Sequence, residues 1–298
     1  MNGVINVYKE CGVTSFYVVA QVRSIFNVKK AGHTGTLDPI AEGVLPICLG
    51  YATKFADIFT TGDKQYIAKF RLGSSYDTFD TTGSILQTSD IRPDEDSIRA
   101  VLEGFTGQRE LTVPAFSAKK INGHRAYDLA RKGELKDAGM ASMKIYKIEF
   151  LSYCYPEGVF VIDCGKGTYV RSVIHEMGVK LGSYAAMSGL IRSRNGPFHM
   201  KDSYKISEIK RLTGEGMGAE LIVPVQDILN IPRAVVKDAV VSSVLNGVSP
   251  QTADYQLLPD TGIGGLCLLT TVKGKVIALG NIQKGFPVPV KLSKVFQD

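Results

Sequence analysis

Strand-like and helix-like segments are mixed along this chain without the regular strand–helix alternation that builds a parallel sheet. Apolar residues that alternate with polar ones predict strands, and apolar residues three and four positions apart predict helices. The predicted strands are 4–8, 66–72, 146–150 and 159–164, and the predicted helices are 14–26, 94–105 and 170–181. The pattern therefore predicts an α+β fold with a mixed, largely antiparallel central sheet flanked by helices.

Two of these elements carry specific expectations about burial. Thr14 predicts the start of the first helix, with Phe16 and Val19 among the apolar positions of its buried face. In the strand over 146–150, Tyr146 shares a face with Ile148 because the two are separated by one polar residue.

A domain boundary is predicted near Pro232. Beyond it come a short helix and a hairpin from Leu266 to Leu279 that reverses at a glycine. We therefore expect a large domain over 1–231 and a small β-rich domain over 232–298. The length of 298 residues and the hydrophobic content of 44% allow a sizeable core.

The charge and the cysteines limit the class of protein. A net charge of +6 and a pI near 8.9 favour a polyanionic partner such as a nucleic acid. Five widely spaced cysteines and four scattered histidines argue against a disulfide framework or a metal site. Because no apolar run reaches membrane-spanning length and the N-terminus lacks the plan of a secretion signal, we expect a cytoplasmic protein without membrane contact.

Residues 32–38, Gly-His-Thr-Gly-Thr-Leu-Asp, carry the strongest local signal for a functional site. Two glycines and two threonines suit a polar loop whose backbone N–H groups and hydroxyls approach an anionic or sugar ligand. Apolar residues flank the loop on both sides, so we expect it to be anchored in packed structure. It delivers one carboxylate, Asp38, directly before Pro39.

The pair Asp38-Pro39 has a second interpretation. Asp is a common N-cap and Pro is favoured at the first helical position, so the pair also predicts the start of a helix. The two interpretations are compatible, because a capping carboxylate can also react.

Arg171 is the second candidate, in the first turn of the helix that follows Gly167. The positive end of the helix dipole disfavours a cation there, so Arg171 indicates either a carboxylate partner or a bound anion. A solvated arginine is the structural alternative. A pairing with Asp38 would keep that carboxylate ionised, as a nucleophile must be.

Tyr66 lies on the apolar face of its strand and is either a core tyrosine or an aromatic platform for a base. Asp77 and Asp80 favour turns over a catalytic acid pair. The basic clusters are each typical of a solvated face, but together they could follow a phosphate backbone. These clusters are Lys29-Lys30, Lys119-Lys120, Arg125, Arg131-Lys132 and Arg192-Ser-Arg194.

In combination and in this order, the motifs closely resemble those of the TruB family of tRNA pseudouridine synthases. The matching segments are 31–55 around Asp38, Asp63 to Tyr66, 72–83 with Asp80, 114–133 with Tyr127, Gly165 to Ser172 around Arg171, and Leu190 to Phe198. The tail resembles the family's small PUA-like RNA-binding domain. The chain departs from the family pattern at Glu10, where Pro is usual, and over 134–144, in the region expected to clasp RNA.

The resemblance implies the pseudouridine synthase fold and the isomerisation of uridine-55 in the T-loop (TΨC arm) of tRNA, without metal, nucleotide or other cofactor. It implies Asp38 as the carboxylate that acts at the nucleoside, Tyr66 as the residue that stacks on the flipped base and takes part in proton transfer, and Arg171 as the partner of Asp38. The substrate-binding residues that it implies are His33, Lys9, Leu190, Gly32 and Thr34.

The chemical route and the wider role stay open at this point. Asp38 can act through a covalent intermediate or by proton abstraction on the way to a glycal. A non-catalytic RNA-binding or RNA-folding protein is the competing class, although Asp38, Tyr66 and Arg171 together favour an enzyme, which a tRNA-folding (chaperone) activity can accompany. A carboxylate glycosidase would need a second facing acid, for which the sequence has no clear candidate. We expect a monomer with no obligatory protein partner.

Overall fold

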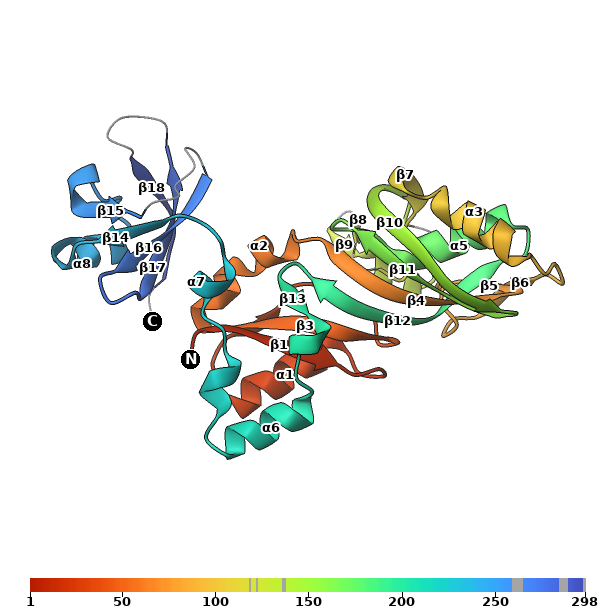
Figure 1. Ribbon diagram of the computed structural model, residues 1–298, viewed down its shortest axis with the longest axis horizontal. Coiled ribbons are helices and arrows are strands. Elements are labelled where there is room, and N and C mark those ends of the chain that lie inside the picture. The colour runs from red at the N-terminus through yellow and green to blue at the C-terminus, as the bar shows by residue number, and fades with distance from the viewer. Residues whose placement is uncertain (118, 122, 136–137, 259–264, 284–288, 297–298) are drawn as a thin grey trace.

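The computed structural model of the chain describes residues 1–298 except 118, 122, 136–137, 259–264, 284–288 and 297–298. A nine-stranded sheet has the order β1-β3-β12-β4-β11-β10-β7, with β2 paired to β3 and β13 to β12 (Figure 1). Its strands are β1 Gly3–Lys9, β2 Ala31–His33, β3 Ala41–Leu49, β4 Lys64–Leu72, β7 Gly107–Thr112, β10 Met140–Cys154, β11 Glu157–Cys164, β12 Ala185–Asn195 and β13 Phe198–His199. The pairing of β12 with β3 is parallel and the other pairings are antiparallel, so the predicted mixed, largely antiparallel sheet is confirmed.

Helices flank the sheet as predicted, in two groups that lie apart. In Figure 1, α1 and α6 lie beside β1 and β3, whereas α3 and α5 lie near β10 and β11. The helices are α1 Ser15–Ile25, α2 Ala56–Thr60, α3 Glu95–Glu103, α4 Ala126–Arg131, α5 Val170–Lys180, α6 Ile206–Gly214, α7 Val225–Ile228 and α8 Val241–Leu245. Two small hairpins pair β5 Ser74–Tyr76 with β6 Ile85–Thr88, and β8 Lys120–Ile121 with β9 His124–Arg125. Strands β4 and β12 run between the two groups of helices and join them.

Helix α1 begins where predicted and buries Val19 and Val22 of the predicted face, but not Phe16. The Thr14 hydroxyl accepts a hydrogen bond from a backbone N–H of the first turn, which caps the helix. Val22 is fully buried, whereas Phe16 is 77% exposed, so the prediction that Phe16 lies on the buried face is wrong. Ser15 is buried in the first turn instead, because its Oγ is hydrogen bonded to both backbone groups of Leu37.

Strand β10 is longer than predicted and contains a bulge. Its register toward β11 shifts between Ile145 and Lys147. Ile145 is therefore fully buried and Tyr146 is 46% exposed, so the expectation that Tyr146 shares a face with Ile148 is wrong. The Tyr146 hydroxyl donates a hydrogen bond to the Asp63 carboxylate at 2.9 Å.

A second sheet begins after Pro232 and has the order β15-β14-β16-β17-β18. Its strands are β14 Arg233–Val236, β15 Tyr255–Leu257, β16 Gly265–Thr271, β17 Val276–Ile282 and β18 Val290–Val295. The predicted hairpin is present as β16 and β17. Phe296, whose ring centroid lies 4.8 Å from that of Phe55, packs this sheet against the N-terminal part of the chain. We propose 1–231 and 232–298 as the two domains.

Candidate active site

Asp38 lies in the connection between β2 and β3, at the start of a turn. No helix follows it, so the interpretation of Asp38-Pro39 as a helix start is wrong. The Asp38 carbonyl accepts a hydrogen bond from the Ala41 N–H at 3.0 Å, and this turn leads directly into β3. The Asp38 side chain is 36% exposed, so a ligand can reach its carboxylate.

Arg171 reaches this turn from α5, in the other group of helices. Its Nη2 lies 3.0 Å from Asp38 Oδ2, and its side chain is 7% exposed. Nη1 also donates to the Thr78 carbonyl and Nη2 to the Phe116 carbonyl, each at 3.0 Å. Arg171 is therefore not a solvated arginine. Three segments from different parts of the sequence hold its guanidinium in one orientation beside the Asp38 carboxylate.

A second carboxylate faces the same guanidinium. Asp80 Oδ2 lies 3.6 Å from Arg171 Nη1, and the Asp80 side chain is 6% exposed. Asp80 Oδ1 also accepts hydrogen bonds from the Thr78 hydroxyl at 2.9 Å and the Thr82 N–H at 3.0 Å, which is the turn geometry that the sequence predicts. The Asp77 carboxylate accepts a hydrogen bond from the Ser84 N–H across the same turn. The arginine thus lies between one accessible and one buried carboxylate.

Arg192 holds the loop before Asp38 in place. It lies on β12 and is 1% exposed. Its Nε donates to the Val44 carbonyl at 2.7 Å, and its terminal nitrogens donate to the carbonyls of Gly35 at 3.0 Å and Thr36 at 3.4 Å. The assignment of Arg192 to a solvated basic cluster is therefore wrong. Gly43, at φ +104°, allows the close approach, since a Cβ there would overlap the Arg192 backbone.

Tyr66 lies opposite Arg192 in the pairing of β4 with β12. It is 8% exposed and packs in the main hydrophobic core. Burial raises the pKa of its hydroxyl, the neighbouring Arg192 opposes the rise, and the charge of Asp38 adds to it. The phenol is therefore neutral near pH 7, and the charges of both Arg192 and Asp38 act on it.

Lys9, at the end of β1, supports the turn after Asp38. It is fully buried, and its Nζ donates to the carbonyls of Ala41 at 2.5 Å and Pro39 at 3.3 Å. Burial lowers the pKa of this amine to about 8, while the nearby Cys11 and Asp38 oppose the fall. The structure thus places Lys9 under the turn, with its charge directed to backbone carbonyls.

Comparison with known proteins identifies the family. The family model described as TruB family pseudouridylate synthase (N terminal domain) matches residues 23–170. The tRNA pseudouridine synthase B of Clostridium tetani is 39% identical over 295 residues, which cover 98% of this chain and 99% of that protein. This chain belongs to the TruB family of pseudouridylate synthases. The tRNA pseudouridine synthase B of Geobacillus thermodenitrificans is 37% identical over 306 residues and covers 100% of both chains.

A likeness to solved structures extends to the tertiary fold. A chain of the crystal structure of a Cbf5-Nop10-Gar1 complex has a TM-score of 0.73 and 29% sequence identity with this one. The match covers 99% of this chain and 85% of that chain, so it includes both sheets. The predicted pseudouridine synthase fold is therefore confirmed.

The remaining predicted residues of this TruB-family chain surround the Asp38 loop. Gly32 and His33 form the end of β2. His33 is half-buried, and its Nδ1 accepts a hydrogen bond from the Gly35 N–H at 3.3 Å. Burial lowers the pKa of the imidazole, and the positive charge of Arg192 lowers it further. His33 is thus a neutral ring at physiological pH, beside the loop that carries the carboxylate.

Thr34 and Leu190 lie deeper than His33. Thr34 is fully buried, and its hydroxyl accepts a hydrogen bond from the Asn195 amide at 3.3 Å. Leu190, on β12, is 8% exposed. The structure brings both residues to the loop, and their roles in substrate binding stay predictions.

Two side chains that position the site were not predicted to do so from the sequence. One is Arg192, and the other is Ser15, which is bonded to the residue before Asp38. A signal for Arg192 does exist in the sequence. It lies two residues after Leu190 on one strand, so an inward Leu190 places Arg192 on the same inward face.

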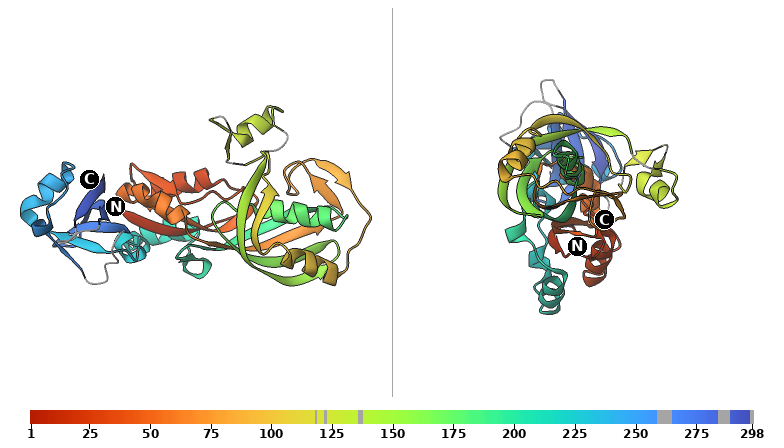
Figure 2. Two further views of the ribbon diagram at one scale, coloured as in Figure 1. Left: turned by 90° about the horizontal axis from the view of Figure 1, so that it is seen from above. Right: turned by 90° about the vertical axis from the view of Figure 1, so that its right-hand side faces the viewer.

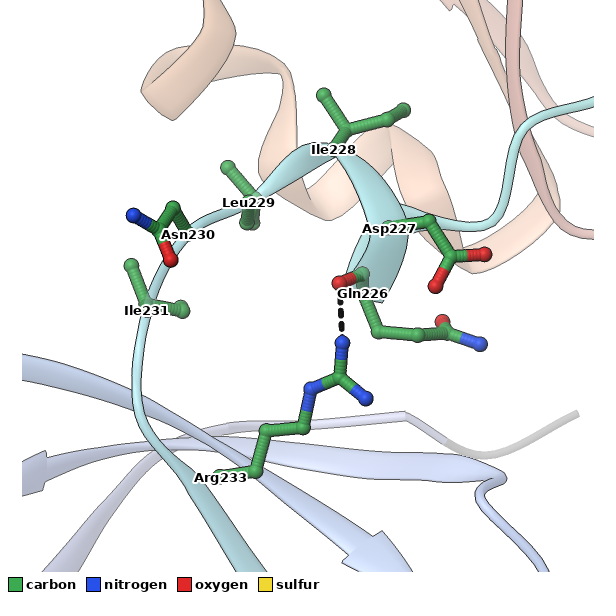
Figure 3. Close-up of a pocket in the computed structure, with 7 residues that line it drawn as sticks. All are labelled: Gln226, Asp227, Ile228, Leu229, Asn230, Ile231 and Arg233. Carbon is green, nitrogen blue, oxygen red and sulfur yellow. Dashed lines mark hydrogen bonds between the residues drawn. The ribbon is translucent and has the colours of Figure 1, made fainter. Parts of the chain in front are cut away.

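Two features of the described residues lie outside this site. No group of three or more His, Cys, Asp or Glu side chains among them could hold a metal ion, and no helix among them is long and apolar enough to cross a membrane. A pocket in the segment between the two sheets is lined by residues 226–231 and Arg233 (Figure 3). There Arg233 Nη2 donates to the Gln226 carbonyl at 2.7 Å, and none of the candidate residues contributes to the pocket.

Proposed function

We propose that this chain isomerises uridine-55 in the T-loop of tRNA to pseudouridine, with Asp38 as the single reacting carboxylate. The observation that carries the proposal is the 3.0 Å pairing of the accessible Asp38 with the buried Arg171. A carboxylate that is fixed by a cation and still reachable is suited to act at one nucleoside. Relatives named tRNA pseudouridine synthase B, which match along the whole chain, support tRNA as the substrate.

For this reaction the protein must position the reacting groups and exclude water from them. The reaction breaks the C1′–N1 bond, turns the detached uracil and joins C5 to C1′; N1 gains a proton and C5 loses one. Asp38 either bonds to C1′ or removes a sugar proton on the way to a glycal. Tyr66 stacks on the flipped base and, being neutral, can pass a proton. No metal, nucleotide or other cofactor is needed for these steps.

The residues around the loop divide the binding work in this proposal. His33 and Gly32 contact the everted nucleotides, since the half-buried imidazole lies beside the loop. Lys9, Thr34 and Leu190 form the floor of the pocket from buried positions. Base extrusion costs a few kcal/mol, roughly, which these contacts and the stacking on the base must offset.

The segment with α4, residues 113–139, is proposed to clasp the T-arm. Figure 2 shows α4 standing away from the main body of the molecule. Arg131 and Lys132 lie at the end of this helix, with Lys132 exposed, so both are placed to meet phosphates. We propose that the chain acts as a cytoplasmic monomer without an obligatory protein partner.

The test is a pseudouridine map of an unmodified tRNA transcript after incubation with wild-type protein or Asp38→Asn, without added metal or nucleotide. We expect modification at uridine-55 with the wild type alone, and equal tRNA affinity for both proteins, because asparagine keeps the shape and removes the charge. Binding by the wild type without any product would replace the proposal with a tRNA-folding role. Product from Asp38→Asn would remove Asp38 from its place in the reaction.

A further inference from the structure

An aromatic stack joins the two segments that hold Arg171. The rings of Phe79 and His175 are parallel within 4°, with centroids 3.8 Å apart. Phe79 directly precedes Asp80, and His175 lies one helical turn after Arg171 on α5. The stack therefore connects the loop over 76–84 to the helix at the place where the Asp80–Arg171 ion pair connects them.

The backbone of Phe79 has a conformation that is unusual for a residue with a side chain. Its φ of +62° lies in the left-handed region, which a residue with a side chain rarely adopts. The Phe79 N–H donates to the Tyr76 carbonyl, and its carbonyl accepts from the Met187 N–H, each at 3.1 Å. This conformation turns the chain so that the next side chain, Asp80, meets Arg171.

His175 contacts Phe79 through the face of its ring, and its Nδ1 does not contribute a hydrogen bond to this contact. That nitrogen is buried and has no hydrogen-bond partner among the described residues. Burial lowers the pKa of the imidazole, so the ring is neutral near pH 7. A neutral ring in parallel contact with Phe79 contributes packing to the loop and no charge to the site.

We propose that Phe79 and His175 are positioning residues for the reaction. Their stack holds residues 78–80 against α5 and so keeps Arg171 in the orientation that meets Asp38. Thr78 accepts from Arg171, Phe79 lies on His175, and Asp80 faces Arg171, so three consecutive residues contact one face of the helix. The inference rests on the proposed function, because its readout is pseudouridine formation.

The test compares two substitutions at one position. His175→Leu removes the ring face, whereas His175→Phe keeps it without a titratable nitrogen. In single-turnover assays we expect His175→Leu to slow pseudouridine formation about tenfold or more, because small displacements of a reacting group are costly, with the Kd for tRNA unchanged. His175→Phe should restore most of the wild-type rate.

Two further variants separate positioning from stability. Tyr153→Leu removes a partly buried ring that stacks on Phe70, with centroids 6.4 Å apart, and should lower the Tm without slowing the reaction. Phe79→Gly suits the left-handed backbone but removes the ring, so it should fold and yet slow the reaction as His175→Leu does.

Each outcome has a distinct meaning. A wild-type rate for His175→Leu or Phe79→Gly would overturn the inference, and so would equal slowing by His175→Leu and His175→Phe. A loss that lies in the Kd for tRNA and not in the rate would also overturn it. Failure of the wild type to form pseudouridine would remove the proposed function, and this inference with it.

Discussion

The Asp38 loop and the exposed face of the segment with α4 are both polar, yet their polar groups are held in different ways. Carbonyls of the loop and of the turn after Asp38 accept hydrogen bonds from two fully buried cations, Arg192 and Lys9, which come from different strands. The α4 segment is anchored in the main core by Val113, Ala126 and Ala138, but its exposed groups are held by contacts at the surface. Arg131 lies 4.7 Å above the ring of Tyr127 on the same helix, and Lys119 Nζ donates to the Ala138 carbonyl at 2.7 Å.

This difference suits the two tasks that the proposed function gives to these regions, the reaction at Asp38 and RNA binding by α4. A buried cation that loses its partners is costly, so the Asp38 loop has one arrangement. Exposed ion pairs and cation–π contacts contribute little, so the exposed face of α4 can adapt to an RNA surface. We therefore expect changes near Asp38 to alter the reaction rate and changes on α4 to alter tRNA affinity.

The largest expected effect is that of Arg171→Ala. It removes the cation between Asp38 and Asp80 and leaves two carboxylates without a shared partner. We expect single-turnover pseudouridine formation to slow about 10³-fold, which corresponds to about 4 kcal/mol. Arg211→Ala is the control, because Arg211 forms only an exposed helical pair with Glu215 and its loss should leave the rate unchanged. A rate near wild type for Arg171→Ala would contradict the proposed role.

The next largest effect is expected on the free energy of unfolding, where two arginines of β12 can be compared. Arg192→Met removes the donor from three backbone carbonyls in a buried place, and the free energy of unfolding should fall by about 3 kcal/mol. Arg194→Met, two residues further, removes a pair with Asp163 that is partly exposed and should cost less than about 1 kcal/mol. Chemical denaturation of both variants measures the two costs. Equal losses would show that burial does not distinguish the two sites.

A smaller effect follows from the pKa of Lys9, which burial lowers to about 8. The unfolded chain holds the proton up to its ordinary pKa near 10.5, so it binds more protons than the folded chain above pH 8. The contribution of Lys9 to the free energy of unfolding therefore becomes more favourable as the pH rises. Between pH 7 and pH 9 we expect the free energy of unfolding of wild type to gain about 1 kcal/mol relative to Lys9→Met. A difference that stays constant with pH would mean that Lys9 titrates normally.

The smallest effect is expected on α4. Arg131→Ala removes a cation–π contact at the surface and should lower the free energy of unfolding by about 0.5 kcal/mol. The single-turnover rate at saturating protein should not change. A loss of several kcal/mol in a denaturation curve would show that α4 is held as firmly as the Asp38 loop, and the comparison would fail.

The residues of the candidate site are easier to predict from the sequence than the buried residues that hold them in place. Asp38 and Arg171 stand out because their local patterns are unusual. Tertiary structure decides the rest. In the first turn of α1, Ser15 is buried by its hydrogen bonds to Leu37, and the adjacent Phe16 is exposed, although the later apolar residues of the helix are buried as predicted. The sequence alone indicates a surface position for Arg192. In the structure β12 lies between β3 and β4, and the Arg192 side chain is buried there.

The fold is predictable to a similar degree. The strands β1, β4 and β11 and the helices α3 and α5 follow simple hydrophobic periods, and the structure has them where the periods place them. Tyr146 departs from its period because a bulge in β10 adds one residue, and a bulge leaves no sign in a short alternating run.

One matched pair tests the separation of rate from affinity most directly. Lys9→Met and Lys132→Met make the same chemical change, the first under the turn after Asp38 and the second at the exposed position directly after α4. The measurement is the single-turnover rate and the tRNA Kd of both variants at pH 7. Because Lys9 is also proposed to line the pocket floor, we predict that Lys9→Met slows the reaction at saturating protein by a larger factor than it raises the tRNA Kd, and that Lys132→Met weakens tRNA binding with an unchanged rate at saturation. An effect of Lys9→Met on the Kd alone, or a slower reaction at saturation for Lys132→Met, would contradict the separation.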